Sequence, residues 1–252
     1  MTLGELLSEL RNNILRDNSH LVAGDKDELW SDETLLQYIK DAEKRFARRT
    51  LIIRDGTTPE VTQLRLRTGQ TTYKLPASVI SVLSARFDVN QFDMARSGHA
   101  LVNQMHPPEF LSFDPTLPYQ VPPGAPLAYY TDETLVYNRQ QAVTLSVFPA
   151  PGADQNGKLV YMRVVRIPTC GYTLADLDKE SEIPEDYQLD TLEWAAYRAL
   201  RGFDSDAGDP ITSETHRQAY ETAIARAIMD MKRTTHADTG IRFGQNGFTW
   251  SS

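Results

Sequence analysis

Apolar side chains recur at intervals of three and four along the first fifty residues, which is the spacing of one face of a helix. This pattern predicts helices over residues 3–17 and 32–49. Thr2 is the predicted N-cap of the first helix, and Ser31, followed by two acids, begins the second. The apolar positions of the two helices are Leu3, Leu6, Leu7, Leu10, Ile14, Leu35, Leu36, Ile39, Ala42 and Phe46.

Residues 51–182 instead alternate apolar and polar positions and are rich in β-branched side chains, a pattern typical of strands. Gly69-Gln70 is a predicted hairpin turn between two of these runs. The cluster of prolines and glycines at 149–157 is predicted to join the last two runs as another hairpin. Seven of the fourteen prolines lie within residues 107–126, which excludes that segment from a helix or a central strand.

The helical spacing returns over residues 186–203 and 213–234. Ile183-Pro184 leads into the first of these helices, and Thr212 or Ser213 is the predicted N-cap of the second. The apolar positions are Leu189, Leu192, Ala195, Ala196, Ala199, Phe203, Ala219, Tyr220, Ala223, Ile224, Ala227, Ile228 and Met231.

These patterns predict an α+β fold with a helical hairpin at each end of the chain. Neither hairpin can bury its apolar face alone, so we expect residues 1–50 and 183–236 to form one four-helix bundle. Residues 51–182 form a central antiparallel β insertion domain. Residues 237–252, which hold three glycines and show no periodicity, form an extended C-terminal arm.

The net charge of −8 is spread over the chain, with balances of −2, −2 and −4 in residues 1–50, 51–182 and 183–252. No part is basic, which argues against tight nucleic-acid binding, because phosphate contacts supply most of that affinity. No stretch approaches the roughly 20 apolar residues of a membrane span, and the N-terminus lacks the apolar run of a signal peptide. Cys170 is alone, so it has no disulfide partner in the chain; folding in a cytoplasm fits these features.

A search for catalytic chemistry finds no phosphate loop, no zinc-protease motif and no nucleophile motif. His106 and Glu109 in the proline-rich segment could form a metal or acid–base site, but proline-rich loops often bring such pairs together by chance. Glycoside hydrolysis needs two carboxylates, and four acids lie close together near the start of the third predicted helix. These acids are better explained as caps of that helix: Glu180, Glu182, Glu185 and Asp186. Cys170 is expected to be inert, and no catalytic residue, cofactor or metal site is predicted.

The order of several short segments resembles the adaptor proteins of tailed bacteriophages, also called head-to-tail connector or head-completion proteins. The segments that carry the resemblance are residues 30–39, 42–50, 69–76, 79–82, 145–151, 163–168, 183–184 and 189–197. The resemblance implies a helical bundle with a β insertion and no catalytic residues. It also implies a structural virion protein at the neck that seals the head after DNA packaging and receives the tail. Members of the family usually form a ring of twelve copies.

The partners implied are the portal protein, a tail nozzle or tail tube protein, and neighbouring copies of the chain. DNA would be only passive channel content, and no membrane is involved. The isolated chain is expected to be monomeric and to form rings on the portal. The predicted interface with the portal or a neighbour combines the apolar arm with the basic end of the helix over 32–49. Its residues are Ile241, Arg242, Phe243, Phe248, Trp250, Arg45, Arg48 and Arg49.

Two alternatives remain open from the sequence. One is a cytoplasmic enzyme with a dispersed site, which no residue spacing supports. The other is a receptor- or glycan-binding tail module with a groove lined by Tyr119, Tyr129, Tyr130 and Tyr137. Alternating aromatics in strands are more often core residues or cross-strand pairs. The basic helix end likewise has two interpretations, a solvated helix terminus or a contact with an acidic partner.

Overall fold

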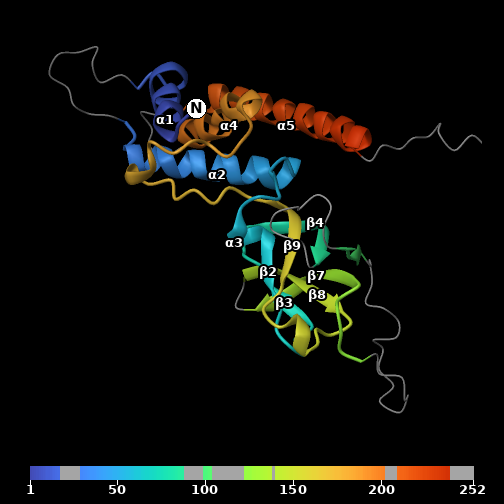
Figure 1. The fold of residues 1–252 in the computed structure, drawn as a ribbon. Coiled ribbons are helices and arrows are strands. Elements are labelled where there is room, and N and C mark those ends of the chain that lie inside the picture. The colour runs from blue at the N-terminus through green and yellow to red at the C-terminus, as the bar shows by residue number, and fades with distance from the viewer. Residues whose placement is uncertain (18–28, 88–98, 104–121, 138–139, 202–208, 239–252) are drawn as a thin grey trace, which may run out of the picture. The chain divides into compact units, whose positions relative to one another are not determined.

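The computed structural model describes residues 1–17, 29–87, 99–103, 122–137, 140–201 and 209–238. Its contacts divide the chain into two compact units. Residues 1–52 and 168–252 form the helical unit, and residues 53–167 form the β unit (Figure 1). Residues 168–182, which the sequence pattern grouped with the strands, thus belong with the helices.

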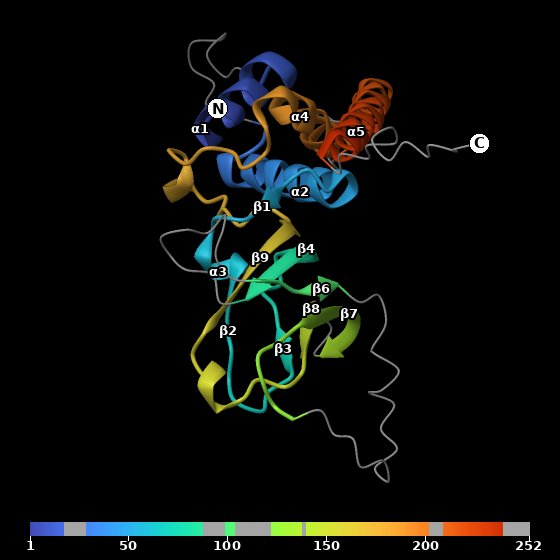
Figure 2. The ribbon, with the colours of Figure 1, turned by 45° about the vertical axis from the view of Figure 1, so that its right-hand side comes forward.

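The helical unit brings together segments from both ends of the chain, and Figures 1 and 2 both show α5 alongside α4. Its elements are α1 (Leu3–Glu9), the π-helical turn η1 (Leu10–Ile14), α2 (Asp32–Thr50), the 3-10 turn η5 (Leu174–Asp176), α4 (Glu185–Leu200) and α5 (Pro210–Asp238).

The helix starts follow local capping chemistry. The Thr2 side chain accepts a hydrogen bond from the Glu5 amide while the Glu5 carboxylate accepts one from the Thr2 amide. Ser31 caps α2 as predicted. The prediction that Thr212 or Ser213 caps the last helix is wrong: the helix begins at Pro210, and Asp209 accepts from the amides of the two following non-proline residues. Proline suits this first position because it has no amide proton to leave unsatisfied.

The core of the helical unit consists of the predicted apolar faces and one aromatic residue from the connecting segment. Its fully buried side chains include Leu6, Leu36, Ile39, Leu192 and Ala195. Contacts join α2 to α4 and α5, and α1 to α2 and α4. Leu189 and Ala219, both predicted to lie on apolar faces, are instead exposed, Leu189 by 52%. The finer arrangement as a four-helix bundle stays a prediction.

The β unit contains short strands and one short helix. They are β1 (Arg54–Asp55), α3 (Pro59–Thr62), β2 (Gln63–Arg65), β3 (Thr72–Lys74), β4 (Val79–Phe87), β5 (His99–Ala100), β6 (Val102–Asn103), β7 (Ala128–Tyr137), β8 (Gln140–Phe148), the 3-10 turn η4 (Ala153–Gln155) and β9 (Leu159–Arg166).

These strands form two sheets that share one apolar core. One sheet has the order β1-β9-β4-β5 with β2 also on β9, and the other has the order β3-β8-β7-β6. Inward side chains of both sheets meet in the core, including Val82, Phe87, Leu145, Val160 and Val164. The pairings are antiparallel as expected, except that β6 runs parallel to β7.

Both predicted hairpins are wrong. Gly69 does turn the chain with a positive φ of 72°, but β2 then pairs with β9 whereas β3 pairs with β8. The segment at 149–157 likewise connects β8 in one sheet to β9 in the other. Alternation reports which face of a strand is buried, and in a two-sheet core that pattern is the same whichever sheet receives the strand.

Among the described residues, no helix combines the length and the apolarity that a membrane span requires. The proline-rich segment 107–126 and the C-terminal arm 237–252 lie largely outside the described residues; the arm is described only to Asp238, which is still part of α5.

Candidate functional site

The basic end of α2 is the part of the predicted interface that the structure describes. Arg45, Arg48 and Arg49 are all exposed. The helix ends at Thr50, so Arg48 and Arg49 lie in its last turn, where cations favour the negative end of the helix dipole. The predicted arm residues lie outside the described part of the chain, namely Ile241, Arg242, Phe243, Phe248 and Trp250.

Arg45 lies over an aromatic ring of the neighbouring helix. Its guanidinium carbon is 4.1 Å from the ring centre of Trp194, a cation–π contact. The indole also packs against Tyr197 and Tyr220, with ring centres 4.9 and 5.2 Å away. The contact therefore holds the side chain of Arg45 against a group of tilted, packed rings from α4 and α5.

Arg49 is held by α5. Two of its nitrogens donate to the two carboxylate oxygens of Glu221, each at 2.7 Å. The hydrogen bonds from Arg49 lower the pKa of Glu221, although burial acts to raise it. Arg48 has no such partner among the described residues and is directed to solvent. Two of the three predicted interface arginines thus stabilise the helical unit itself, which sequence reasoning did not anticipate.

Three further arginines from α4 and α5 join these two. Arg198 lies over the ring of Tyr38 at 5.5 Å, and Arg201 binds the ring and the hydroxyl of Tyr197. Arg217 donates two hydrogen bonds to Glu214, which lowers the pKa of that carboxyl to about 2.

We define the arginine face as Arg45, Arg49, Arg198, Arg201 and Arg217, with the rings that they contact. Glu221 interacts electrostatically with three of these arginines, Arg49, Arg45 and Arg217, so the groups from α2 and α5 form one cluster. Two glutamates take part in its ion pairs, which leaves an excess of positive charge. In the sequence, the spacing of Arg198 and Arg201 places both on one side of the predicted helix, which was the only local sign of the arginine face. That α2 lies beside this side of α4 follows only from the packing of the helices.

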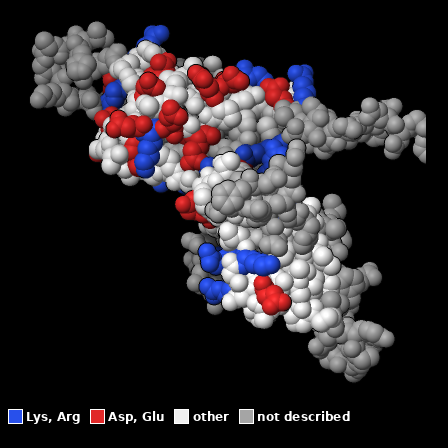
Figure 3. All heavy atoms as spheres, in the orientation of Figure 1, with Lys and Arg blue, Asp and Glu red and all other residues white. Residues whose placement is uncertain are grey.

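The arginine face is an exception within its unit. The helical unit contains 16 basic and 25 acidic side chains, whereas the β unit contains 10 and 9. Figure 3 shows acidic side chains over much of the visible face of the helical unit and few charged groups on that of the β unit. A concentration of arginines on the acidic unit is therefore a local feature and not an average property.

A buried polar cluster lies on the other side of α2. Glu43 is fully buried, and its carboxylate accepts hydrogen bonds from the hydroxyls of Tyr172 and Ser181, the latter at 2.7 Å. Burial raises the pKa of Glu43, and the two hydroxyl donors oppose that rise. Tyr172 adopts a positive φ of 53°, a strained conformation for a bulky residue, which the packing around it maintains.

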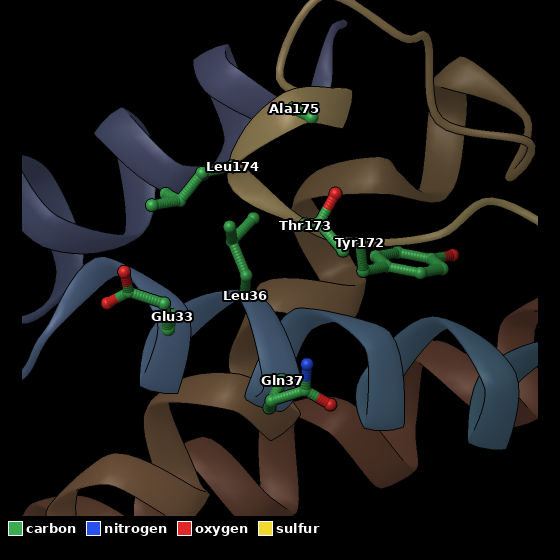
Figure 4. Close-up of a pocket in the computed structure, with 7 residues that line it drawn as sticks. All are labelled: Glu33, Leu36, Gln37, Tyr172, Thr173, Leu174 and Ala175. Atoms are coloured by element: carbon green, nitrogen blue, oxygen red, sulfur yellow. The ribbon is translucent and has the colours of Figure 1, made fainter.

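Near this cluster, a shallow hollow lies between the first half of α2 and turn η5 (Figure 4). Its volume is about 310 Å³, and it is lined by Glu33, Leu36, Gln37, Tyr172, Thr173, Leu174 and Ala175. The lining brings no nucleophile and base together. Among the described residues, no cluster of histidine, cysteine and acidic side chains could hold a metal ion.

The other sequence candidates are dispersed. His106 and Glu109 lie outside the described residues. Glu182 accepts hydrogen bonds from the amides of Thr169 and Cys170, and Glu185 lies in the first turn of α4, so both carboxylates have local structural roles.

The structure describes the side chains of two of the four tyrosines that were predicted to line a groove. Tyr129 is 1% exposed and belongs to the core of the β unit, where burial raises the pKa of its hydroxyl. Tyr130, its neighbour on β7, is half-buried. Tyr119 lies outside the described residues, and the side chain of Tyr137 does too. One of the four tyrosines predicted to line the groove is thus a core residue.

Comparison with known proteins gives the chain a family. The sequence model described as SU10 adaptor protein matches residues 1–242, which include both units. No curated protein matches the chain. Because the match extends over far more than half of the sequence, the chain belongs to the SU10 adaptor protein family, a family of structural adaptors of bacteriophages.

Proposed function

We propose that this protein forms the adaptor ring between the portal and the tail of a tailed bacteriophage. In this role it seals the head after DNA packaging and offers the tail its attachment platform at the neck of the virion. The observation that carries the proposal is the family match through both units. The arginine face supplies an exposed charged surface that a protein partner could bind.

The partners in this proposal are the portal protein, a tail nozzle or tube protein, and neighbouring copies in a ring of twelve. DNA passes the ring without specific contact, because the chain carries a net charge of −8. The surfaces offered to the portal or to a neighbour are the C-terminal arm and the exposed end of α2.

The arm supplies the apolar anchors. Phe243, Phe248 and Trp250 follow the end of α5 at Asp238 by 5 to 12 residues. Fourteen extended residues reach roughly 45 Å, which is enough to cross a subunit boundary. Buried aromatic anchors at interfaces often contribute about 2 kcal/mol or more each.

The test is reconstitution on purified portal rings, read by negative-stain imaging and by a binding titration. The full chain is expected to form rings on portals. A chain that ends after Asp238 keeps every described helix; it is expected to stay a folded monomer with near-normal thermal stability and to lose portal binding.

A matched pair of full-length variants separates the effect of the aromatic side chains of the arm from the effect of shortening the chain. Replacing Phe243, Phe248 and Trp250 by alanine should weaken portal binding at least about tenfold. Replacing Gln245, Asn246 and Thr249 by alanine in the same arm should leave it unchanged. Failure of the full chain to bind portals would contradict the adaptor role, whereas unchanged binding by the shortened chain would contradict only the role of the arm.

A further inference from the structure

The helical unit carries an acidic segment as well as the arginine face. Between η5 and the first turn of α4, four carboxylates are exposed, those of Asp178, Glu180, Glu185 and Asp186. No ion pair engages any of the four within the described part of the chain. We call residues 178–186 the acidic strap.

The strap has a fixed backbone. Glu180 pairs with Thr2 as a β-bridge, and the amide of Leu3 donates to the carbonyl of Lys179 at 2.8 Å. Ser181 is tied to the buried Glu43 on α2, and Ile183 is 2% exposed. The carboxylates therefore stand on a preordered edge, so a partner that binds them loses little conformational entropy.

The strap and the arginine face lie on opposite sides of α2. With 3.6 residues per turn, Arg45 and Arg49 lie roughly 40° apart on the helix, whereas Glu43 lies roughly 160° from Arg45. Glu43 contacts the strap through Ser181, and Arg45 and Arg49 contact α4 and α5. The helical unit thus carries the arginine face and the acidic strap on different sides of α2.

Two different complementary surfaces on opposite sides of one protomer fit a head-to-tail contact, which closes into a ring when the rotation allows it. We propose that the arginine face of one copy binds the acidic strap of the next. The inference rests on the proposed ring and specifies the contact between its neighbours.

The charge distribution favours a second copy over a nucleic acid as the occupant. A chain of net charge −8 repels a polyanion as a whole, so only a short, local group of carboxylates can approach the arginines. The guanidinium groups of Arg45, Arg198 and Arg201 lie over the rings of Trp194, Tyr38 and Tyr197. A guanidinium group is suited to bind a carboxylate through its N–H groups. The strap offers four exposed carboxylates.

The test reverses each surface in the full chain and follows self-association by sedimentation velocity. Variant A is Arg45→Glu with Arg198→Glu, and variant B is Asp178→Lys with Glu180→Lys; all four positions are exposed. The unmodified chain is expected to be monomeric at low micromolar concentration. It should associate at high concentration in about 20 mM salt and dissociate in about 0.5 M salt, because screening weakens contacts between charges.

Each variant alone is expected to associate at least about tenfold more weakly, because like charges then meet. An equimolar mixture of A and B restores opposite charges at every contact, and it should recover association to within about threefold of the unmodified chain. A misfolded variant cannot show this recovery, so the mixture also controls for folding.

Three outcomes would overturn the inference: no association of the unmodified chain, unchanged association of A or B alone, or no recovery in the mixture. Salt-sensitive binding of a DNA oligonucleotide that A loses and B keeps would also overturn it in favour of a nucleic-acid surface. If one of these outcomes occurred but variants A and B still bound portal rings as the unmodified chain does, only the proposed contact between neighbours would be wrong. The adaptor role would then stand.

Discussion

Glu43 in the helical unit and Asp55 in the β unit are both buried carboxylates, and their surroundings differ. Glu43 has two hydroxyl donors and pairs with no cation among the residues that the structure describes, and burial raises its pKa. Asp55 has Arg166 at 2.6 Å and the amides of Thr57 and Thr58. Although burial acts to raise it, these hydrogen bonds hold the pKa of Asp55 well below its ordinary value.

The difference shows how each unit fixes its connecting segments. In the β unit, a fully partnered acid ties the short strand β1 to β9. In the helical unit, neutral hydroxyls from Tyr172 and Ser181 tie the segment before α4 to α2. The arginine and the amides around Asp55 favour its ionised form. The hydroxyls around Glu43 offset only part of the cost of burying its ionised form. The two units should therefore respond differently to mutation and to pH.

The largest effect is expected from breaking the ion pair of the β unit. Arg166→Ala leaves Asp55 buried without its cation, which should cost about 3–5 kcal/mol of unfolding free energy. Chemical denaturation with hydrogen exchange read separately for each unit would measure it. Lys74→Ala, at an exposed site in the same unit, should stay within about 0.5 kcal/mol of the unmodified chain. Equal losses in the two variants would contradict the role given to the pair.

Removing one hydroxyl from the helical cluster is expected to have a smaller effect. Tyr172→Phe keeps the ring in the core but deprives Glu43 of a donor, which should cost about 1–3 kcal/mol. Tyr38→Phe in the same unit keeps the ring under Arg198 and is the control, with no measurable change expected. Thermal denaturation at neutral pH compares them, and an unaltered melting temperature for Tyr172→Phe would exclude the cluster as a stabilising element.

The pH dependence should have opposite signs at the two acids. The folded pKa of Glu43 is raised above its ordinary 4.5, so its contribution is complete below that pH and is lost as the pH rises through the folded pKa. The folded pKa of Asp55 is lowered from 3.8, so its contribution is present above that pH and is lost as the pH falls.

These signs can be read from two substitutions. Relative to the unmodified chain, Glu43→Gln should gain stability as the pH rises above 4.5, and Asp55→Asn should gain relative stability as the pH falls below 3.8. Melting temperatures from pH 3 to pH 8 would measure both differences. The same sign for the two variants would refute the comparison.

The smallest effect is expected at the arginine face. Arg49 and Glu221 are about one third exposed, so their bidentate pair should contribute only about 0.2–1 kcal/mol. A double-mutant cycle with both alanine variants measures the coupling. A coupling of several kcal/mol would mean that the face exists mainly to stabilise the fold and not to meet a partner.

The helices could be predicted from the sequence because each buries one continuous stripe. Leu6, Leu36 and Leu192 follow that periodicity and are fully buried. The prediction for Leu189 was wrong because this residue lies at the edge of its apolar stripe, where burial depends on packing that periodicity does not report. The strand partners could not be predicted, because alternation in β8 and β9 does not say which sheet each strand joins.

The candidate surfaces were predictable only in part. Arg45 and Arg49 stand out in the sequence as a basic helix end, but their partners Trp194 and Glu221 lie about 150 to 170 residues away in the chain. Glu43 and Tyr172 are also far apart, at 129 residues, and neither residue is unusual in its local sequence. Such long-range pairs depend on packing that no local pattern reports.

The adaptor role is tested most directly by a cryo-EM map of portal rings saturated with the full chain. The account predicts a closed ring of copies with the helical units and residues 239–252 at the portal, and with the acidic strap of each copy against the arginine face of its neighbour. A portal without bound chain, or copies attached only through their β units, would contradict it.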